Sequence, residues 1–365
     1  MDPTAINRDK PRPGIWEHAR LGRVDIIRTH RVRLTTMPKR VAVVGAGVSG
    51  LTAGCLLAEC GYDSTIVADE IGLQTTSGAA GAIWFPYDVE PFDAALKWAL
   101  ESYQTFEQLS QNRNSGVSMI ELRTFSRDGT ITIPAWAAGL GATRITDTVS
   151  TTHFVRQAEV QMTESPKIFS SGFSLMVPLI DTSIYLDFLA ARFRVAGGKL
   201  ITNRRLKHLK DIGPEFPVIV NCAGIGAGTL VSDPDLEPHR GQVVIVPKLN
   251  LSEAIVCDDA PLMYAIPRTN DCLFGGTNEV SDDRTPAAAT TAAILKECSR
   301  VLGITEPEVL AARVGLRPFR RSGIRLETER LGDQTVIHNY GHGGAGFTLS
   351  WGCAGQVLRL LEASH

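Results

Sequence analysis

The chain has 365 residues, of which 44% are hydrophobic and 21% charged, with a formal net charge of −2 at pH 7. This length predicts two domains, and the near-neutral charge argues against nucleic acid as a main partner. No apolar run approaches the roughly 18 residues needed to span a bilayer, so we expect no membrane partner. The seven scattered cysteines include no CxxC pair, which favours free thiols in a reducing cytoplasm over disulfides or a zinc site.

Residues 1–36 are more basic than the rest of the chain, and Pro3, Pro11 and Pro13 break any early helix. They contain no apolar core of a secretory signal. We expect a disordered extension, or an upstream start codon in place of Met37, which directly precedes the first predicted strand. A basic targeting arm is the alternative.

The segment 40–50, RVAVVGAGVSG, predicts a strand, a glycine turn and the start of a helix. Its valines are typical of a strand buried on both faces of a parallel sheet. Gly45, Gly47 and Gly50 match GxGxxG: the first permits the turn, the second lets the backbone approach a pyrophosphate, and the third lets the helix pack closely. The free N–H groups at 48–51 would face the phosphates.

A second strand, at 65–68, ends at Asp69 and Glu70, about where a carboxylate accepts a hydrogen bond from a ribose hydroxyl. The strand, turn, helix and acids together predict a dinucleotide site. The loop at 73–87 then offers the hydroxyls of Thr75 and Thr76 and the uncovered backbone of Ala80, Gly81 and Ala82, against which a flat ring could lie. A flexible Gly/Ala linker is the alternative.

The remaining pattern predicts further helices and strands in chain order. We expect helices at 88–112, 181–193, 287–302 and 306–312. We expect strands at 125–133 with a hairpin turn at Gly129, and at 169–177, 199–202, 206–209, 217–220, 241–246, 254–256, 263–266 and 272–275. The fold class is therefore α/β (α+β overall), with a second domain of antiparallel sheet starting near residue 119.

Two later segments repeat the passage from a strand into a glycine turn. NCAGIGAGTL, at 221–230, indicates that the first domain is assembled from discontinuous pieces. The segment 336–351, VIHNYGHGGAGFTLSW, predicts a strand, a glycine-rich loop and a helix running to Leu361. In a doubly wound fold these turns could meet one cofactor at the carboxyl ends of the strands.

These segments resemble the D-amino-acid and D-aspartate oxidases, a family of FAD enzymes. The matching motifs are VVGAGVSGL at 43–51, the TT…AAG loop at 75–81, VNCAGIGAGTL at 220–230, HRGQ at 239–242, MYAIPR at 263–268, GLRPFRR at 315–321 and IHNYGHGGAG…SWG at 337–352. The resemblance implies a Rossmann-like FAD-binding domain and an antiparallel-sheet substrate domain. Their expected bounds are 37–118 with 179–240 and 311–365 for the first, and 119–178 with 241–310 for the second.

The resemblance also implies the reaction: a hydride passes from Cα of a D-amino acid to N5 of FAD, and water converts the imino acid to a 2-oxo acid and ammonia. Oxygen then reoxidises the flavin and yields hydrogen peroxide. The alternatives are a glycine/sarcosine-type amine oxidase and a non-catalytic FAD-binding protein. The sequence defines no oligomeric state, and a homodimer is the assembly that we consider.

Four catalytic positions follow from the resemblance. Arg317 matches the arginine that pairs with the substrate carboxylate, and a guanidinium has the donor geometry for it; a surface charge is the alternative. Tyr264 matches the tyrosine that also holds the carboxylate, although an aromatic in a strand is more often core. The backbone near Gly344 would receive the substrate amine. Asn278 replaces a second tyrosine of yeast-type members, so the pocket should differ in size and polarity.

The FAD contacts implied by the motif and the resemblance lie in five segments of the chain. They are Gly45, Ala46, Gly47, Val48, Ser49, Gly50, Asp69, Glu70, Thr75, Thr76, Ala80, Gly81, Ala82, Leu206, Gly343, Gly344, Gly346, Phe347 and Thr348. The segment 257–262 is short, so no lid is expected there. His338 and His342 stand four apart in a glycine loop rather than on a helix, and they predict no metal site.

Overall fold

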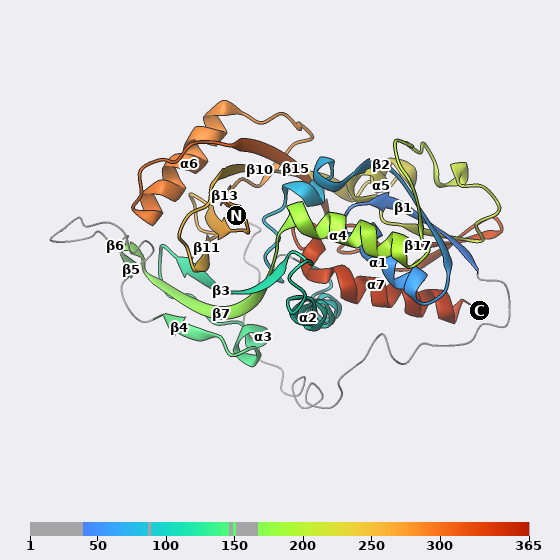
Figure 1. Ribbon diagram of the computed structural model, residues 1–365, viewed down its shortest axis with the longest axis horizontal. Helices are drawn as coiled ribbons and strands as arrows, with labels where there is room; N and C mark the ends of the chain where they lie inside the picture. Colours follow the sequence, from blue (N-terminus) through green and yellow to red (C-terminus); the bar gives the residue numbers. More distant parts are fainter. Residues whose placement is uncertain (1–38, 87–88, 146–148, 151–166, 365) are drawn as a thin grey trace, which may run out of the picture.

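Two sheets organise the chain, and they lie side by side in the computed structural model (Figure 1). The structure describes residues 39–86, 89–145, 149–150 and 167–364, so the extension expected at 1–36 lies outside the described residues. Within these ranges, the search for a helix long and apolar enough to cross a membrane finds none.

The first sheet has six strands in the order β16-β17-β9-β1-β2-β8, and all neighbours are parallel except β16 and β17. Its strands are β1 (Arg40–Ala46), β2 (Asp63–Ile71), β8 (Lys199–Ile201), β9 (Val218–Asn221), β16 (Thr328–Leu331) and β17 (Gln334–His338). This confirms the predicted α/β class. The strand predicted at 206–209 is wrong. This segment leaves the edge of the sheet, and Leu209 is buried on the face of the sheet that carries Ala42 and Val44.

Strand β1 lies in the middle of this sheet because its side chains are apolar on both faces. Val41 and Val43 pack toward the helices, whereas Ala42 and Val44 pack toward the segment that carries Leu209. Successive side chains of a strand point to opposite faces, so the unbroken apolar run has a partner on each side.

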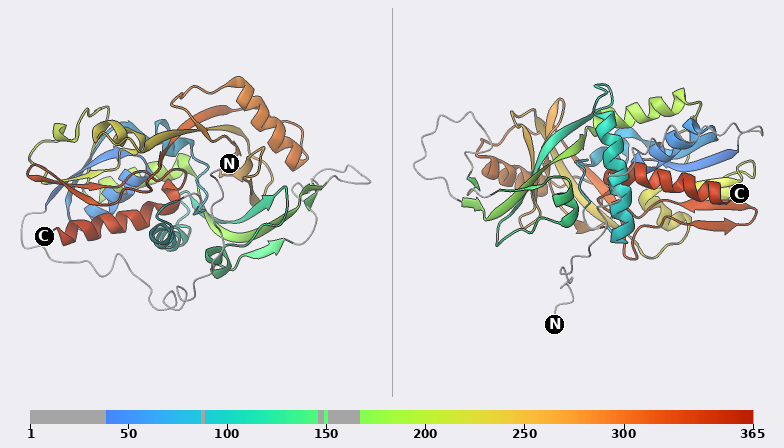
Figure 2. Two further views of the ribbon diagram at one scale, coloured as in Figure 1. Left: turned by 180° about the vertical axis from the view of Figure 1, so that it is seen from behind. Right: turned by 90° about the horizontal axis from the view of Figure 1, so that it is seen from below.

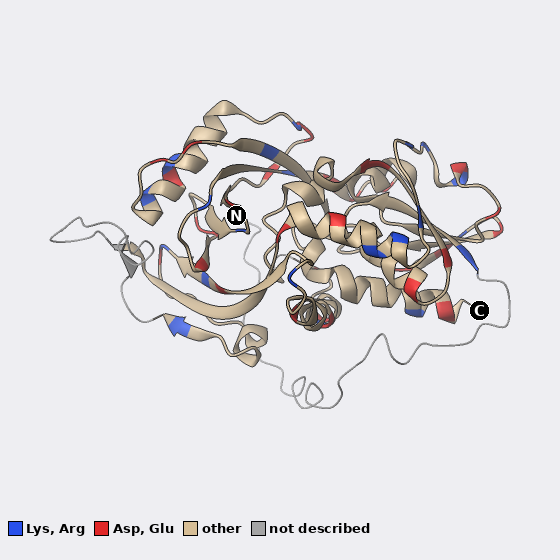
Figure 3. Ribbon diagram, viewed as in Figure 1, with Lys and Arg blue, Asp and Glu red and all other residues tan. Residues whose placement is uncertain are grey.

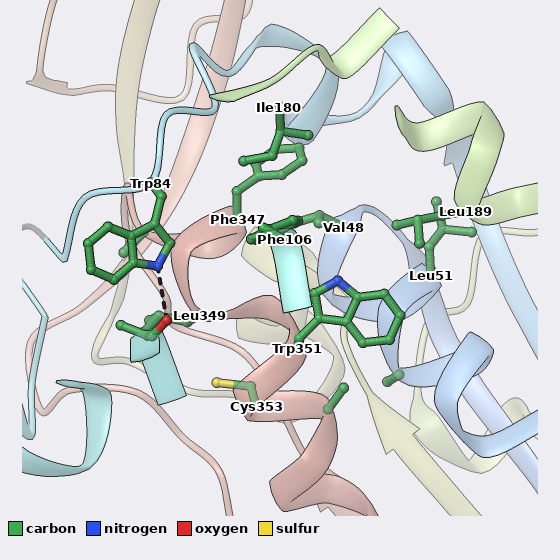
Figure 4. Close-up of a cluster of buried hydrophobic side chains, with 14 of the residues drawn as sticks. Val48, Leu51, Trp84, Phe106, Ile180, Leu189, Phe347, Leu349, Trp351 and Cys353 are labelled. Atoms are coloured by element: carbon green, nitrogen blue, oxygen red, sulfur yellow. Dashed lines mark hydrogen bonds between the residues drawn. The ribbon is translucent and has the colours of Figure 1, made fainter. Parts of the chain in front are cut away.

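A layer of helices covers the face of the first sheet onto which Val41 and Val43 point. It contains α1 (Val48–Glu59), α4 (Thr182–Val195) and α7 (Gly346–Ala363), while α2 (Phe92–Leu109) crosses between the two sheets (Figure 2). Figure 4 shows Leu51, Phe106 and Trp351 converging where these helices meet. The Trp84 indole donates to the Ala99 carbonyl at 2.9 Å. The Asp181 side chain caps α4 by accepting from the Ser183 amide.

The second sheet has nine strands in the order β14-β10-β13-β12-β11-β3-β7-β4, with β15 beside β10. Its strands are β3 (Val117–Ser126), β4 (Thr143–Ile145), β7 (Ser171–Ile180), β10 (Leu236–Pro247), β11 (Glu253–Cys257), β12 (Met263–Pro267), β13 (Asp271–Gly275), β14 (Glu279–Val280) and β15 (Ala311–Arg320). All pairings are antiparallel except β3 with β11, which is parallel. Helix α6 (Ala288–Leu302) buries its apolar side, including Ile294 and Cys298, against one face.

The shorter elements complete the described chain. They are α3 (Ala135–Gly139), α5 (Ala227–Leu230), the 3-10 turns η1 (Gly72–Gln74), η2 (Thr76–Ala79), η4 (Leu209–Asp211) and η5 (Gly224–Gly226), and the paired strands β5 (Val149–Ser150) and β6 (Lys167–Phe169). Lys and Arg alternate with Asp and Glu over both halves of the molecule, in keeping with the near-neutral net charge (Figure 3).

Two further predicted elements are wrong because long strand pairings outweigh local propensity. The helix expected at 306–312 is irregular chain followed by the start of β15, whose whole length pairs with β10. The hairpin expected at 125–133 is absent from the described residues there, since β3 ends at Ser126 and pairs instead with β7. Strand β15 belongs to the second sheet, although the predicted bounds place it with the first domain; those bounds stay a prediction.

Candidate functional site

A cavity of about 930 Å³ lies between the carboxyl edge of the first sheet and the inner face of the second. One side, here called the glycine wall, consists of the cavity residues of the three glycine turns: 45–49, 223–226, and Gly343, Gly344 and Gly346. The opposite side, the strand wall, consists of the cavity residues of β10, β11, β12 and β15. Every predicted catalytic and FAD-contacting residue lines this cavity except Gly50.

Gly50 acts one layer behind the cavity. A Cβ on Gly50 would overlap the backbone oxygen of Gly45, so only glycine lets α1 approach β1 this closely. Gly45 itself has φ +104°, and a Cβ there would overlap the backbone of Cys222. The first and third glycines of the motif therefore hold the turn together, while the backbone between them faces the cavity.

Two helices start at the cavity, which therefore receives the positive ends of two helix dipoles. The first residue of α1, Val48, donates its amide to Ser77 Oγ at 3.0 Å. The first turn of α7 brings Phe347 and Thr348 to the cavity, and the Thr348 hydroxyl donates to the Phe85 carbonyl and accepts from its amide, both at 3.1 Å. Helix N-termini of this kind suit phosphate groups.

The two acids at the end of β2 differ in their partners. Glu70 accepts from Arg284 at 2.6 Å, an ion pair that joins the first sheet to the loop after β14. Asp69 is half exposed and lies 4.0 Å from the Arg205 side chain, next to Leu206 in the cavity lining. Asp69 therefore keeps more of its accepting capacity for a ligand than Glu70 does.

The loop at 75–82 lines the cavity mainly with backbone atoms, because its threonine hydroxyl groups are bonded elsewhere in the protein. Thr75 Oγ1 donates to the Gly72 carbonyl at 2.7 Å, and Thr76 Oγ1 donates to the Leu316 carbonyl at 3.1 Å. These bonds fix the loop in shape and anchor it to β15. A Cβ on Gly81 would come within 2.8 Å of Ile266, so the loop also lies tightly on β12.

Arg317 extends from β15 and is held by neutral acceptors. Its Nη1 donates to the Thr277 carbonyl at 2.9 Å and lies 3.4 Å from Asn278 Oδ1. Across the described part of the chain, no carboxylate lies within 4.0 Å of this guanidinium. A Cβ on Gly241, in the neighbouring strand β10, would come within 2.5 Å of three guanidinium atoms. Sequence reasoning missed Gly241 as a site residue, although it lies in the HRGQ motif and is a glycine inside a predicted strand.

Tyr264 places its hydroxyl near this guanidinium. Burial raises the pKa of Tyr264, while the nearby positive charge of Arg317 partly lowers it. The hydroxyl is therefore protonated at neutral pH and can donate. A Cβ on Gly275 or Gly276 would overlap the Tyr264 ring, so these two glycines make room for it.

The third glycine turn runs beside Arg317. The Gly343 amide donates to the Pro318 carbonyl at 2.9 Å, and a Cβ on Gly344 would lie 3.6 Å from Arg317 Cδ. His342 bonds through Nε2 to Asn339 Oδ1 at 3.1 Å, and burial lowers the pKa of His342 to about 4, so the imidazole is neutral. His338 does not line the cavity and bonds to Glu329 instead. No cluster of three metal-binding side chains occurs among the residues that the structure describes.

The cavity fits an elongated dinucleotide with a ring system, because it combines a glycine wall, two helix N-termini and a carboxylate at the end of β2. Residues 40–360 match the model of the FAD dependent oxidoreductase family. The protein is therefore an FAD-dependent oxidoreductase.

The relatives define the branch of this family. The chain is 36% identical to a "D-amino-acid oxidase" of Rubrobacter xylanophilus, over 89% of this chain and 96% of that one. It is 32% identical to a "D-aspartate oxidase" of Homo sapiens, over 88% and 94% of the two chains. It belongs to the D-amino-acid/D-aspartate oxidase family, as the sequence motifs predict. A glycine oxidase structure from Geobacillus kaustophilus has a TM-score of 0.71 at 17% identity, over 89% and 95% of the chains, and shows a shared fold.

Proposed function

We propose that this protein oxidises D-amino acids to 2-oxo acids, ammonia and hydrogen peroxide. The observation that carries the proposal is the Arg317 guanidinium, which faces a cofactor-sized cavity and, within the described ranges, has only neutral hydrogen-bond acceptors. A substrate carboxylate is the natural partner for such a cation. The named activity of the relatives supports the D-configured substrate.

In this proposal the glycine wall and the two helix N-termini hold FAD. The backbone at 45–49 and the N-terminus of α1 bind the pyrophosphate, and Asp69 binds the ribose. The loop at 80–82 and the turn at 343–344 lie against the flavin ring. When bound, FAD accepts the two electrons removed from the substrate and passes them to oxygen.

The strand wall positions the substrate. Arg317, from β15, and the neutral Tyr264 hydroxyl, from β12 of the same sheet, bind the carboxylate, and the backbone near Gly344 receives the amine. Asn278 lies at the edge of the same guanidinium and borders the carboxylate position. Holding reactants in the productive orientation can recover on the order of 7–11 kcal/mol of barrier, which makes positioning the main task of these side chains.

Anaerobic spectroscopy tests this function. The purified holoprotein is mixed separately with D-alanine, L-alanine, glycine and sarcosine, and the absorbance of oxidised flavin at about 450 nm is followed. We expect D-alanine to bleach the flavin and L-alanine to leave it unchanged. Bleaching by glycine or sarcosine alone would instead establish an amine oxidase of the other type. A yellow protein that none of them bleaches would indicate a non-catalytic flavoprotein.

A reducing cytoplasmic location is part of the proposal. All seven cysteines are free thiols, six of them are buried, and burial raises the pKa of the thiols, to about 12 for Cys222 and about 11 for Cys60. Such thiols suit a reducing compartment. A homodimer stays a prediction of the sequence, and sedimentation of the holoprotein would test it.

A further inference from the structure

A carboxylate beside the strand wall has no role in the reaction proposed above. Asp258 directly follows β11 and lines the cavity, two residues after Val256, which also lines it. Val256 stands opposite Tyr264 in the pairing of β11 with β12, so these side chains share one face of the sheet. Asp258 is also close enough to Tyr264 for its negative charge to raise the pKa of the Tyr264 hydroxyl.

The neighbouring Asp259 shows what a structural carboxylate looks like at this place. Its Oδ2 accepts from Ser126 Oγ at 2.8 Å and from the Arg127 amide at 2.7 Å. Asp258 has no such hydrogen bond or ion pair among the residues described. Asp258 is an exposed residue, and desolvation by the surrounding protein and the negative charge of Asp259 raise its pKa, so a cation in the cavity would stabilise its ionised form.

The cations that line the cavity have partners other than Asp258. Arg204 donates to the Asp211 carbonyl, and Arg205 lies 4.0 Å from Asp69. Glu70 and Arg284 pair with one another at the end of β2. Arg317 is held by Thr277 and Asn278, and its free side is the proposed position of the substrate carboxylate. The strand wall therefore presents a cation for the α-carboxylate, and the segment directly after β11 presents a carboxylate to the same cavity.

We propose that Asp258 selects D-amino acids whose side chains end in a cation, the class of D-lysine, D-ornithine and D-arginine. The proposal rests on the proposed oxidation of D-amino acids by this cavity. The substrate carboxylate binds Arg317, its methylene chain lies along the apolar lining that includes Val256 and Leu262, and its terminal ammonium or guanidinium reaches Asp258. The same carboxylate repels acidic side chains, so specificity includes a repulsive component.

Isosteric substrate pairs isolate the charge of the side chain. Steady-state kcat/KM is measured at pH 7.5 for D-lysine against D-norleucine, and for D-glutamate against D-glutamine. We expect D-lysine to exceed D-norleucine and D-glutamine to exceed D-glutamate. In Asp258→Asn the preference for D-lysine should fall about tenfold, the loss expected when a charge-assisted hydrogen bond is removed. The preference against D-glutamate should weaken in the same variant.

The control is Asp128→Asn, which removes the same charge from an exposed turn and should leave both ratios unchanged. Flavin absorbance of each variant confirms that the holoprotein is intact. The role of Asp258 would be overturned by equal kcat/KM values for D-lysine and D-norleucine in the unaltered enzyme, or by unchanged ratios in Asp258→Asn. In either case, measurable oxidation of D-norleucine would show that the proposed function still holds. If no D-amino acid in the set is oxidised, the proposed function fails, and the role of Asp258 fails with it.

Discussion

The two sides of the cavity are built on different principles. The glycine wall presents backbone, and its geometry depends on the absence of side chains: a Cβ at Gly45, or at Gly50 directly behind the wall, would overlap main-chain atoms. The strand wall presents side chains, and Arg317 and Tyr264 come from β15 and β12, two strands distant in the chain that belong to one sheet. Contacts to a cofactor shared by a large family suit backbone, whereas contacts that distinguish substrates suit replaceable side chains.

This difference predicts how substitutions on the two sides should fail. A change in the glycine wall should remove the cofactor or the fold itself, because main chain cannot move without moving β1 and α1. A change in the strand wall should leave a yellow, folded protein with altered kinetics.

The largest effect is expected from Gly50→Ala. The added Cβ would meet the Gly45 carbonyl, and neither backbone segment can yield without separating α1 from β1. We expect the purified variant to carry no flavin or to be insoluble, as measured by absorbance and yield. Gly355→Ala in α7 is the control, since its Cβ would come no closer than 3.5 Å to another atom. Because alanine favours a helix over glycine by roughly 0.5–1 kcal/mol, this control should keep its flavin and its melting temperature.

Arg317→Ala should have the next largest effect, and only on kinetics. Removing one partner of a hydrogen-bonded charge pair costs about 2–5 kcal/mol, which corresponds to a loss of kcat/KM on the order of 30- to 4,000-fold. Flavin content should not change. Arg321→Ala removes an exposed arginine four residues further along and should behave as the unaltered enzyme does. An Arg317→Ala enzyme with normal kcat/KM would refute the carboxylate role.

The contrast between the walls also explains what could be predicted from the sequence. The glycine wall was predictable because consecutive residues form it, and a turn with GxGxxG permits few conformations. Arg317 and Tyr264 were identified by resemblance, since nothing local distinguishes them from other strand residues. Gly241 was missed because its role depends on the pairing of β10 with β15. The helix expected at 306–312 was wrong for the same reason: the pairing that decides it is non-local.

Gly241→Ala should perturb the strand wall through Arg317 alone. The new Cβ would come within 2.5 Å of the guanidinium, and a flexible side chain can move away, so the fold should survive. Crowding of this kind costs about 1–3 kcal/mol, and we expect kcat/KM to fall by about tenfold with flavin retained. In the Arg317→Ala background the same substitution should have no further effect. Additive losses in this double-mutant cycle would mean that Gly241 has a role of its own.

The smallest effect is expected at a residue that connects the two sides. Asp233, whose side chain is 4% exposed, accepts from Tyr340 Oη at 2.7 Å and from Arg320 Nε at 2.8 Å. Tyr340 begins the third glycine turn, and Arg320 ends β15. Burial alone would raise the pKa of Asp233, but the hydrogen bonds from Tyr340 and Arg320 outweigh it and hold this pKa below its ordinary value.

The sign of the pH dependence follows from that lowered pKa. Ionised Asp233 stabilises the fold at every pH above its unfolded pKa of about 3.9, and this contribution is lost as the pH falls through the lower folded value. We expect Asp233→Asn to reduce the free energy of unfolding by about 1.5–3 kcal/mol at pH 7. The difference in the free energy of unfolding between the variant and the unaltered protein should shrink below about pH 4. Urea titrations at pH 7 and at a pH below about 4 measure it. A difference independent of pH would mean that Asp233 stabilises the contact between Tyr340 and Arg320 through its packing. Its charge would then not couple the glycine wall to the strand wall.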